Sequence, residues 1–299
     1  TRTPKISFFS LLPSQVGQVT VVASLAHQGV AVALAERAER PLEWPGLGRR
    51  VPPPFLLVLA DDSAALAKLS HGRVPGWGAG VAFPGANTIL LRADLPNLEQ
   101  TLHHELGHLI LKMVVSGRVP LWFDEGYAAW GSGELGRMEG LELNLAVASG
   151  RVPTFAELDE MLRGSAAAAD LAYALAASAV AEIARRPPPG GLEPLLARLS
   201  AGEDFDSALV SATGLSPDRF EETWQHALRR RYSVLTWLVA GGMWGVIAFS
   251  LGGLLWYRRQ RDRPRRAALD DGWVVQEEPE TSGEQSTDPR PVDREGPTQ

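Results

Sequence analysis

The chain has 299 residues, of which 45% are hydrophobic and 21% are charged, so it carries enough apolar side chains to bury a sizeable core. Its formal net charge is −6, and nothing in this balance indicates a nucleic-acid partner. The absence of cysteine excludes thiolate metal sites, cysteine nucleophiles and disulfide bonds.

The first hundred residues carry the patterns of a small sheet. Short apolar runs at residues 19–23 and 54–60 are typical of strands, and residues 25–39 between them have a helical pattern. Gly80–Phe83 and Thr88–Arg92 flank a Pro-Gly-Ala-Asn sequence, which predicts two strands joined by a turn. Beyond this pair the pattern is helical. The order predicts an α+β fold, in which a small mixed sheet packs on a helix and a helical lobe follows.

An H-E-x-x-H motif lies at the start of this helical part, within the sequence His-His-Glu-Leu-Gly-His at residues 103–108. His104 and His108 are four positions apart, so on a helix they share one face and can bind one metal ion. Glu105 lies about 100° around the same helix, where its carboxylate reaches a metal-bound water without ligating the metal. The motif therefore predicts two metal ligands and a general base. His103 faces another direction, which indicates a surface or supporting role.

The flanking residues predict that the motif lies on a helix. Asn97 and Gln100 form a plausible capping box at its start. Apolar residues recur at helical spacing and are expected to face the core: Leu102, Leu106, Leu109, Ile110 and Met113.

A third ligand is expected in the next segment, because a catalytic zinc ion has three protein ligands and an open position for water. Residues 120–127 read Pro-Leu-Trp-Phe-Asp-Glu-Gly-Tyr, and Glu125 lies near the start of a second predicted helix. Asp124 has two interpretations. It is either an acceptor for a ligand imidazole or the N-cap of the second helix, and we favour the cap.

H-E-x-x-H followed by W-x-x-E-G at this distance resembles the gluzincin metallopeptidases, especially the membrane-associated peptidase MA-like group. The resemblance covers about residues 54–232. It implies that one zinc ion is the cofactor and that Glu125 is its third ligand. It also implies that Tyr173, in a later helical run, stabilises the oxyanion; a core tyrosine on an alanine-rich helix is the alternative.

The related thermolysin-like enzymes bind the substrate backbone along an edge strand beside the zinc helix. The matching strand here consists of Gly80, Val81, Ala82 and Phe83. Pairing of a peptide with an exposed strand edge is a known binding mode, and ordinary sheet structure is the equal alternative for these four residues.

These features predict an endopeptidase that hydrolyses polypeptides with a zinc-activated water and Glu105 as general base. Gluzincin aminopeptidases carry a G-x-M-E-N signature before the zinc helix, whereas residues 136–140 follow it and lack the Asn, which favours an endopeptidase. The main alternative is a non-catalytic, membrane-anchored binding or scaffold module that retains the metallopeptidase fold. Hydrolysis of a non-peptide amide is a second alternative.

Residues 235–257 form an uncharged, apolar run that is long enough to cross the hydrocarbon core of a bilayer. A buried core helix is the less favoured alternative, because a soluble helix of this length should show a polar face. Six arginines follow the run and three precede it, so we expect the tail in the cytoplasm and the N-terminal domain outside. Gly241 and Gly245 form a small-xxx-small pair that would support a weak homodimer through the span, although glycine is common in such helices.

The chain is therefore divided into three parts. Residues 1–231 are the expected zinc metallopeptidase domain, and residues 232–257 are a single transmembrane helix. Residues 258–299 are expected to be a disordered cytoplasmic tail, because the end of the chain has too few large aliphatic side chains to offset the entropy of folding.

Overall fold

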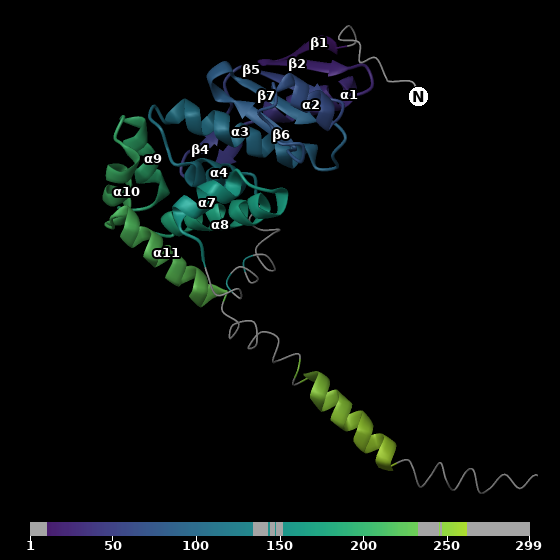
Figure 1. Cartoon of the computed structure of the whole chain (residues 1–299), viewed down its shortest axis with the longest axis vertical. Helices are drawn as coiled ribbons and strands as arrows, with labels where there is room; N and C mark the ends of the chain where they lie inside the picture. Colours follow the sequence, from purple (N-terminus) through teal and green to yellow (C-terminus); the bar gives the residue numbers. More distant parts are fainter. Residues whose placement is uncertain are drawn as a thin grey trace, which may run out of the picture. The chain divides into compact units, whose positions relative to one another are not determined.

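The computed structural model describes residues 11–133, 143, 147, 152–232, 245 and 247–261. The chain divides into two compact units, Thr1–Ala240 and Gly241–Gln299. The sheet and the helices α1 to α11 belong to the first unit (Figure 1). Most of the predicted tail lies outside the described residues.

A five-stranded mixed sheet forms one part of the first unit. Its strands, in spatial order, are β1 (Leu11–Val16), β2 (Val19–Ser24), β5 (Phe55–Ala60), β7 (Thr88–Arg92) and β6 (Gly80–Phe83). The two edge strands, β1 and β6, are antiparallel to their neighbours, and the three inner strands are parallel to one another. The predicted α+β class with a mixed sheet is confirmed.

Both faces of this sheet are covered by helices. One face packs against α1 (Gln28–Ala38) and α3 (Leu98–Val114), and the other packs against α2 (Ser63–Leu69). The side chains of β5 alternate accordingly, since Leu59 belongs to the main core and Val58 to a smaller cluster beneath α2. This alternation is what the period-two geometry of a strand requires when both faces are buried.

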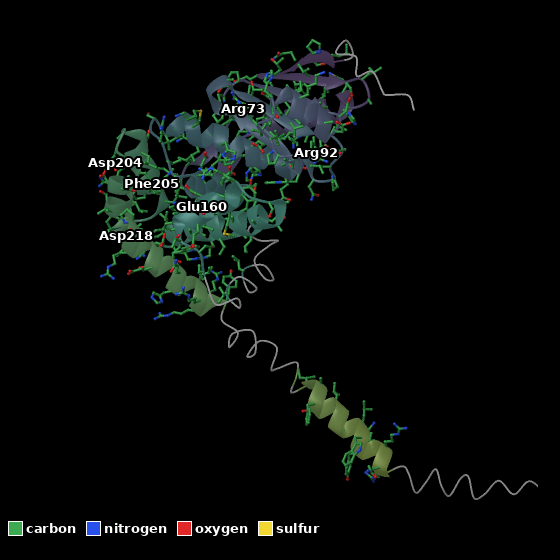
Figure 2. All side chains as sticks on the ribbon, viewed as in Figure 1. Arg73, Arg92, Glu160, Asp204, Phe205 and Asp218 are labelled. Carbon is green, nitrogen blue, oxygen red and sulfur yellow. The ribbon has the colours of Figure 1, made fainter. Side chains whose placement is uncertain are left out.

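The helical lobe follows α3, as the sequence predicts. Its described helices are α4 (Leu121–Gly131), α7 (Phe155–Leu162), α8 (Ala166–Ala184), α9 (Leu192–Ser200), α10 (Phe205–Thr213) and α11 (Pro217–Arg231). The long, alanine-rich helix α8 packs against both α4 and α7. Figure 2 labels Asp204, Phe205 and Asp218 on the green helices α10 and α11, and Arg92 on the part of the chain that carries the sheet.

Several elements were not predicted from the sequence. They are β1, the helix α2 and a hairpin made of β3 (Leu42–Trp44) and β4 (Gly48–Arg50). Two details of the prediction for α3 are wrong. Asn97 is the N-cap, but its side chain makes no capping hydrogen bond, and Met113 is 46% exposed instead of facing the core.

One described helix, α8, is long and apolar enough to cross a membrane by length and composition, but most of it is buried inside the helical lobe. The predicted span at residues 235–257 lies largely outside the described residues. Its described end, residues 247–257, is part of a helix that continues to residue 261. The large apolar side chains of that segment are exposed: Ile247, Phe249, Leu251, Leu254, Leu255, Trp256 and Tyr257.

Candidate metal centre

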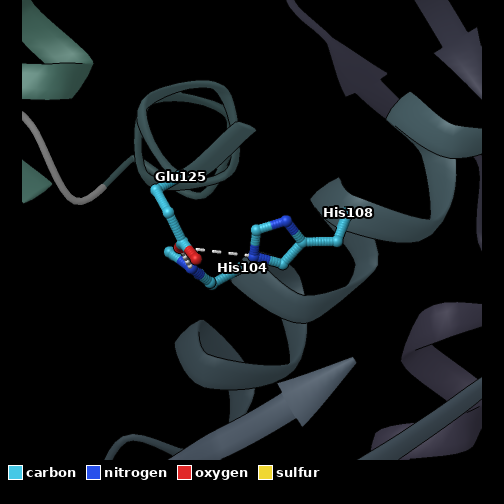
Figure 3. A group of neighbouring side chains, drawn as sticks. All are labelled: His104, His108 and Glu125. Carbon is cyan, nitrogen blue, oxygen red and sulfur yellow. Dashed lines mark hydrogen bonds and ion pairs between the residues drawn. The ribbon is translucent and has the colours of Figure 1, made fainter. Parts of the chain in front are cut away.

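Two consecutive helices of the first unit bring the three predicted metal ligands together. His104 and His108 project from adjacent turns of α3, and Glu125 projects from α4 (Figure 3). The Glu125 Oε2 atom lies 3.4 Å from His104 Nε2 and 3.5 Å from His108 Nε2. One donor atom from each of the three residues lies within 4.8 Å of the others.

These separations fit a single metal ion. Zinc binds imidazole nitrogen and carboxylate oxygen at about 2.0–2.2 Å in a tetrahedral arrangement, which places two donors about 3.3 Å apart. The two nitrogen–oxygen distances are close to this value. The donor set of two imidazoles and one carboxylate matches the ligands of catalytic zinc sites and leaves the fourth corner for water or substrate.

Asp124 fixes the orientation of His108. Its Oδ1 atom lies 2.8 Å from His108 Nδ1, so the Nδ1–H group donates to the carboxylate and Nε2 remains turned to Glu125. A carboxylate behind a ligand imidazole sets the tautomer and orientation of the ring. Our preferred interpretation of Asp124 as an N-cap is wrong, because Pro120 is the N-cap of α4 and Asp124 lies inside the first turn.

The three donors are also coupled electrostatically. Burial raises the pKa of Glu125, but the two imidazoles outweigh this effect and hold it well below its usual range. Burial lowers the pKa of His108, and the nearby charges of Glu125 and Asp124 outweigh it, so the pKa lies well above 6.5. The carboxylate form of Glu125, which is the form that binds a metal ion, is therefore the favoured one.

Glu105 is buried next to the donors but is not one of them. Burial is the largest effect on its carboxyl group and raises its pKa, against the charges of His104 and His108 and a hydrogen bond with the backbone of Ala82. Glycine at position 80 makes room for it, because a Cβ there would lie 3.0 Å from Glu105 Oε1. The strand β6 and the helix α3 thus hold this carboxyl group between them.

Tyr173 and His103 lie on different sides of α3. The ring of Tyr173, on α8, is perpendicular to the ring of His104, with 5.7 Å between centroids. His103 instead meets the buried Trp44 edge to face at 4.9 Å. The structure therefore brings Tyr173 to the donors, whereas His103 contacts the β3–β4 hairpin and is not among the three clustered donors.

Two of the three donors, those of His104 and Glu125, border a cleft of about 930 Å³. Its lining includes residues between Gly72 and Val81 and residues from the end of α7 and from α8, Tyr173 among them. His104, Glu105 and Glu125 also line it. Of the predicted substrate strand, Gly80 and Val81 line this cleft, whereas Ala82 and Phe83 are not part of the lining.

A protein-family comparison covers this whole arrangement. The family model of the Peptidase MA superfamily matches residues 58–230, which is more than half of the chain. The chain belongs to the Peptidase MA superfamily. Comparison with curated proteins found no match. Membership indicates a peptidase-like function acting on polypeptides, in a clan whose peptidases are usually metal-dependent.

In this member of the superfamily, two glycines allow the helices of the site to approach closely. A Cβ on Gly107 of α3 would lie 2.9 Å from the Ala128 Cα atom of α4. A Cβ on Gly126 of α4 would lie 2.5 Å from the Ala176 carbonyl oxygen of α8. Since Gly126 follows Glu125 directly, the contact between α4 and α8 fixes the depth at which this carboxylate enters the site.

Sequence reasoning missed the structural roles of Gly80 and Gly126 and favoured the wrong role for Asp124. A signal exists for Asp124, since it directly precedes Glu125 and a carboxylate in this place can accept a hydrogen bond from a ligand imidazole. Gly126 belongs to the W-x-x-E-G motif, but the partner that requires glycine there, Ala176, lies fifty residues later. No local pattern identifies such a contact.

Proposed function

We propose that this chain is a membrane-anchored zinc endopeptidase. The observation that carries the proposal is the convergence of His104, His108 and Glu125 donors beside the buried Glu105 at a cleft. Membership of the Peptidase MA superfamily supports it independently. In this proposal, the three donors hold one zinc ion, which supplies a Lewis acid that makes water more acidic and polarises the scissile carbonyl.

Glu105 is the general base in this proposal. It accepts a proton from the water molecule that attacks the peptide carbonyl, and it delivers that proton to the amine that leaves when the C–N bond breaks. Its surroundings support both steps. Burial and the charge of Glu125 raise the pKa of Glu105 while the neighbouring imidazoles lower it, and the net effect is a raised pKa, which favours a group that has to hold a proton during the reaction.

The peptide is proposed to pair with β6. This strand is at the edge of the sheet and is bonded to β7, and its residues Gly80 and Val81 line the cleft next to Glu105. A peptide added to this edge passes the metal centre with its backbone held by main-chain hydrogen bonds. Ala82 and Phe83 extend the pairing surface. Tyr173 is proposed to donate its hydroxyl hydrogen to the developing oxyanion.

The membrane anchor is proposed at residues 235–257. The exposed apolar side chains on the described part, residues 247–257, support it because a helix with this surface is stabilised by lipid and not by water. The dimer through Gly241 and Gly245 stays a prediction.

A comparison of the parent protein with the Glu105→Gln variant tests the catalytic proposal. Zinc content and cleavage of β-casein are measured for both. We expect the parent to cleave casein, to lose this activity with a zinc chelator and to regain it when zinc is added back. The variant should retain its zinc and lose about 100-fold or more in rate, since it has no group to transfer the proton. Bound zinc in the parent without chelator-sensitive cleavage would instead support a non-catalytic binding module.

A further inference from the structure

The cleft beside the metal centre carries two arginines from different parts of the fold. Arg73 lies in the loop before β6, and Arg163 is the C-cap residue of α7. Both line the same cleft as His104 and Glu105. Figure 2 labels Arg73 on the part of the chain that carries the sheet, and Glu160 of α7 on the helical part. Both residues therefore belong to the wall of one cleft, Arg73 from the loop before β6 and Arg163 from the end of α7.

Neither guanidinium has a carboxylate partner among the described residues. The Arg73 guanidinium lies over the ring of Phe83, 5.8 Å from its centroid. Arg163 donates to the Asp159 carbonyl oxygen at 2.8 Å. Arg92, by contrast, makes two hydrogen bonds of 3.0 Å to the carboxylate of Asp94, as expected of an arginine whose role is structural.

The contacts that these two exposed arginines make restrict their side chains without neutralising their charge. A guanidinium over an aromatic ring, or bonded to a backbone carbonyl, keeps its full charge and most of its five donors. Restricting the side chain beforehand lowers the entropy cost of binding an anion. Apart from the residues of the metal site, the cleft lining has one more charged side chain, that of Asp170. Asp170 already has an interaction within the protein.

We propose that Arg73 and Arg163 select substrates with acidic side chains near the scissile bond. The inference rests on the proposed peptidase function and names the substrate class of that site. Carboxylates of Asp or Glu match the fork of a guanidinium and form charge-assisted, paired hydrogen bonds with it. Arg73 lies against Phe83 at the end of β6, so it contacts an acidic side chain of the part of the peptide that pairs with this strand. Arg163 contacts an acidic side chain of the peptide next to the helical lobe.

Three pools of degenerate decapeptides, blocked at both ends, test this specificity. At nine positions all three pools contain the same mixture of neutral residues. At the one central position, each pool carries Glu, Gln or Lys. Full-length parent protein is mixed with each pool, and mass spectrometry gives the rate of cleavage on either side of the fixed residue. We expect the Glu pool to be cut fastest. Each of Arg73→Gln and Arg163→Gln should lower the preference for Glu over Gln about fivefold, as expected for an ion pair that is open to water.

A charge reversal and a matched control sharpen the test. Arg163→Glu should shift the preference towards the Lys pool, which loss of folding cannot produce. Arg49→Gln removes an exposed arginine outside the cleft and should leave the preference unchanged. Equal cleavage of the three pools by the parent, or a preference for Glu that survives both Gln variants, would overturn the proposal.

A binding measurement separates this inference from the proposed function. Fluorescence anisotropy with labelled Glu, Gln and Lys peptides on the Glu105→Gln variant gives affinities without any cleavage. If the parent cuts no pool, the peptidase function fails, but tighter binding of the Glu peptide that is lost with Arg73→Gln and Arg163→Gln still supports the acidic specificity. Equal affinities for the three peptides would contradict it.

Discussion

Gly80 shows how a single missing side chain supports the chemistry of the site. A Cβ at this position would lie 3.0 Å from Glu105 Oε1, 2.7 Å from Leu91 Cδ2 and 3.1 Å from the Leu90 carbonyl oxygen. Distances below 3.4 Å leave no space for a carbon atom, so a neighbour has to move. Leu91 Cδ2 and the Glu105 carboxyl are both at the ends of flexible side chains, whereas the Leu90 carbonyl is backbone, so these two side chains have to shift.

Replacement of Gly80 by Ala should therefore displace Glu105 and leave the metal ligands in place. We expect the rate of peptide cleavage to fall roughly tenfold or more, because small shifts of a catalytic group are costly, while zinc content stays near that of the parent. Gly85→Ala is the matched control, since Gly85 lies in the turn of the same hairpin with nothing within 4 Å of its added Cβ. Unchanged cleavage by Gly80→Ala would show that this position does not set the place of Glu105.

At the scale of elements, the site depends on how closely α4 packs between α3 and α8. The two contacts that set these spacings involve Gly107 and Gly126, one on each side of α4. The added Cβ at Gly126 meets backbone atoms of α8 at 2.5 and 2.6 Å, and backbone inside a packed helix cannot step aside as a flexible side chain can. The helix α4 would have to move, and Glu125 would move with it.

We predict that Gly126→Ala lowers the free energy of unfolding by about 3 kcal/mol, the upper end of typical overpacking, and weakens zinc binding. Gly117→Ala is the control, because an added Cβ there meets nothing within 4 Å, and its effect should be within about 0.5 kcal/mol. Urea unfolding followed by circular dichroism measures both. Equal midpoints for the two variants would mean that the α4–α8 contact is looser than the distances indicate.

The elements that could be predicted from the sequence are those with a local pattern. A turn sequence between the two strands predicts the pair β6–β7. Helical spacing of apolar residues around the H-E-x-x-H motif predicts α3. The β3–β4 hairpin has three residues per strand, which is too short for a period to be visible. The N-cap prediction for Asp124 is wrong because capping depends on where the helix begins, and α4 begins at Leu121.

The remaining features of the site depend on contacts between distant segments. Whether Arg73 or Arg163 has a carboxylate partner is decided by folding, because any partner can come from elsewhere in the chain. The same is true of the glycine at 126, whose neighbour is on α8. The clustering of His104, His108 and Glu125 could therefore be predicted from the sequence, whereas the contacts of these arginines and of the glycine at 126 could not.

At the scale of the whole molecule, the proposed span would hold the proposed peptidase unit at a membrane. Residues 247–257 belong to the second unit, outside the unit that holds the metal centre. Their apolar side chains are exposed, with Phe249 at 87% and Leu255 at 67%, and such a surface is costly in water. The arginines after this run favour a cytoplasmic tail.

The proposed topology predicts that the full-length chain resists extraction from membranes by alkaline carbonate. Protease added to the outside of intact cells should digest the N-terminal domain, whereas an epitope tag at the C-terminus should be protected until the membrane is opened. A shielded N-terminal domain with an accessible tail would reverse the orientation, and release by carbonate would remove the anchor from the account.

Zinc K-edge X-ray absorption of the full-length protein tests most directly whether one ion is held by the two imidazoles of α3 and the carboxylate of α4. We predict about one zinc per chain, with four nitrogen or oxygen neighbours at about 2.0–2.2 Å and the multiple-scattering pattern of two imidazoles. A protein without bound zinc, or a spectrum with fewer than two imidazole ligands, would contradict the assignment of this site.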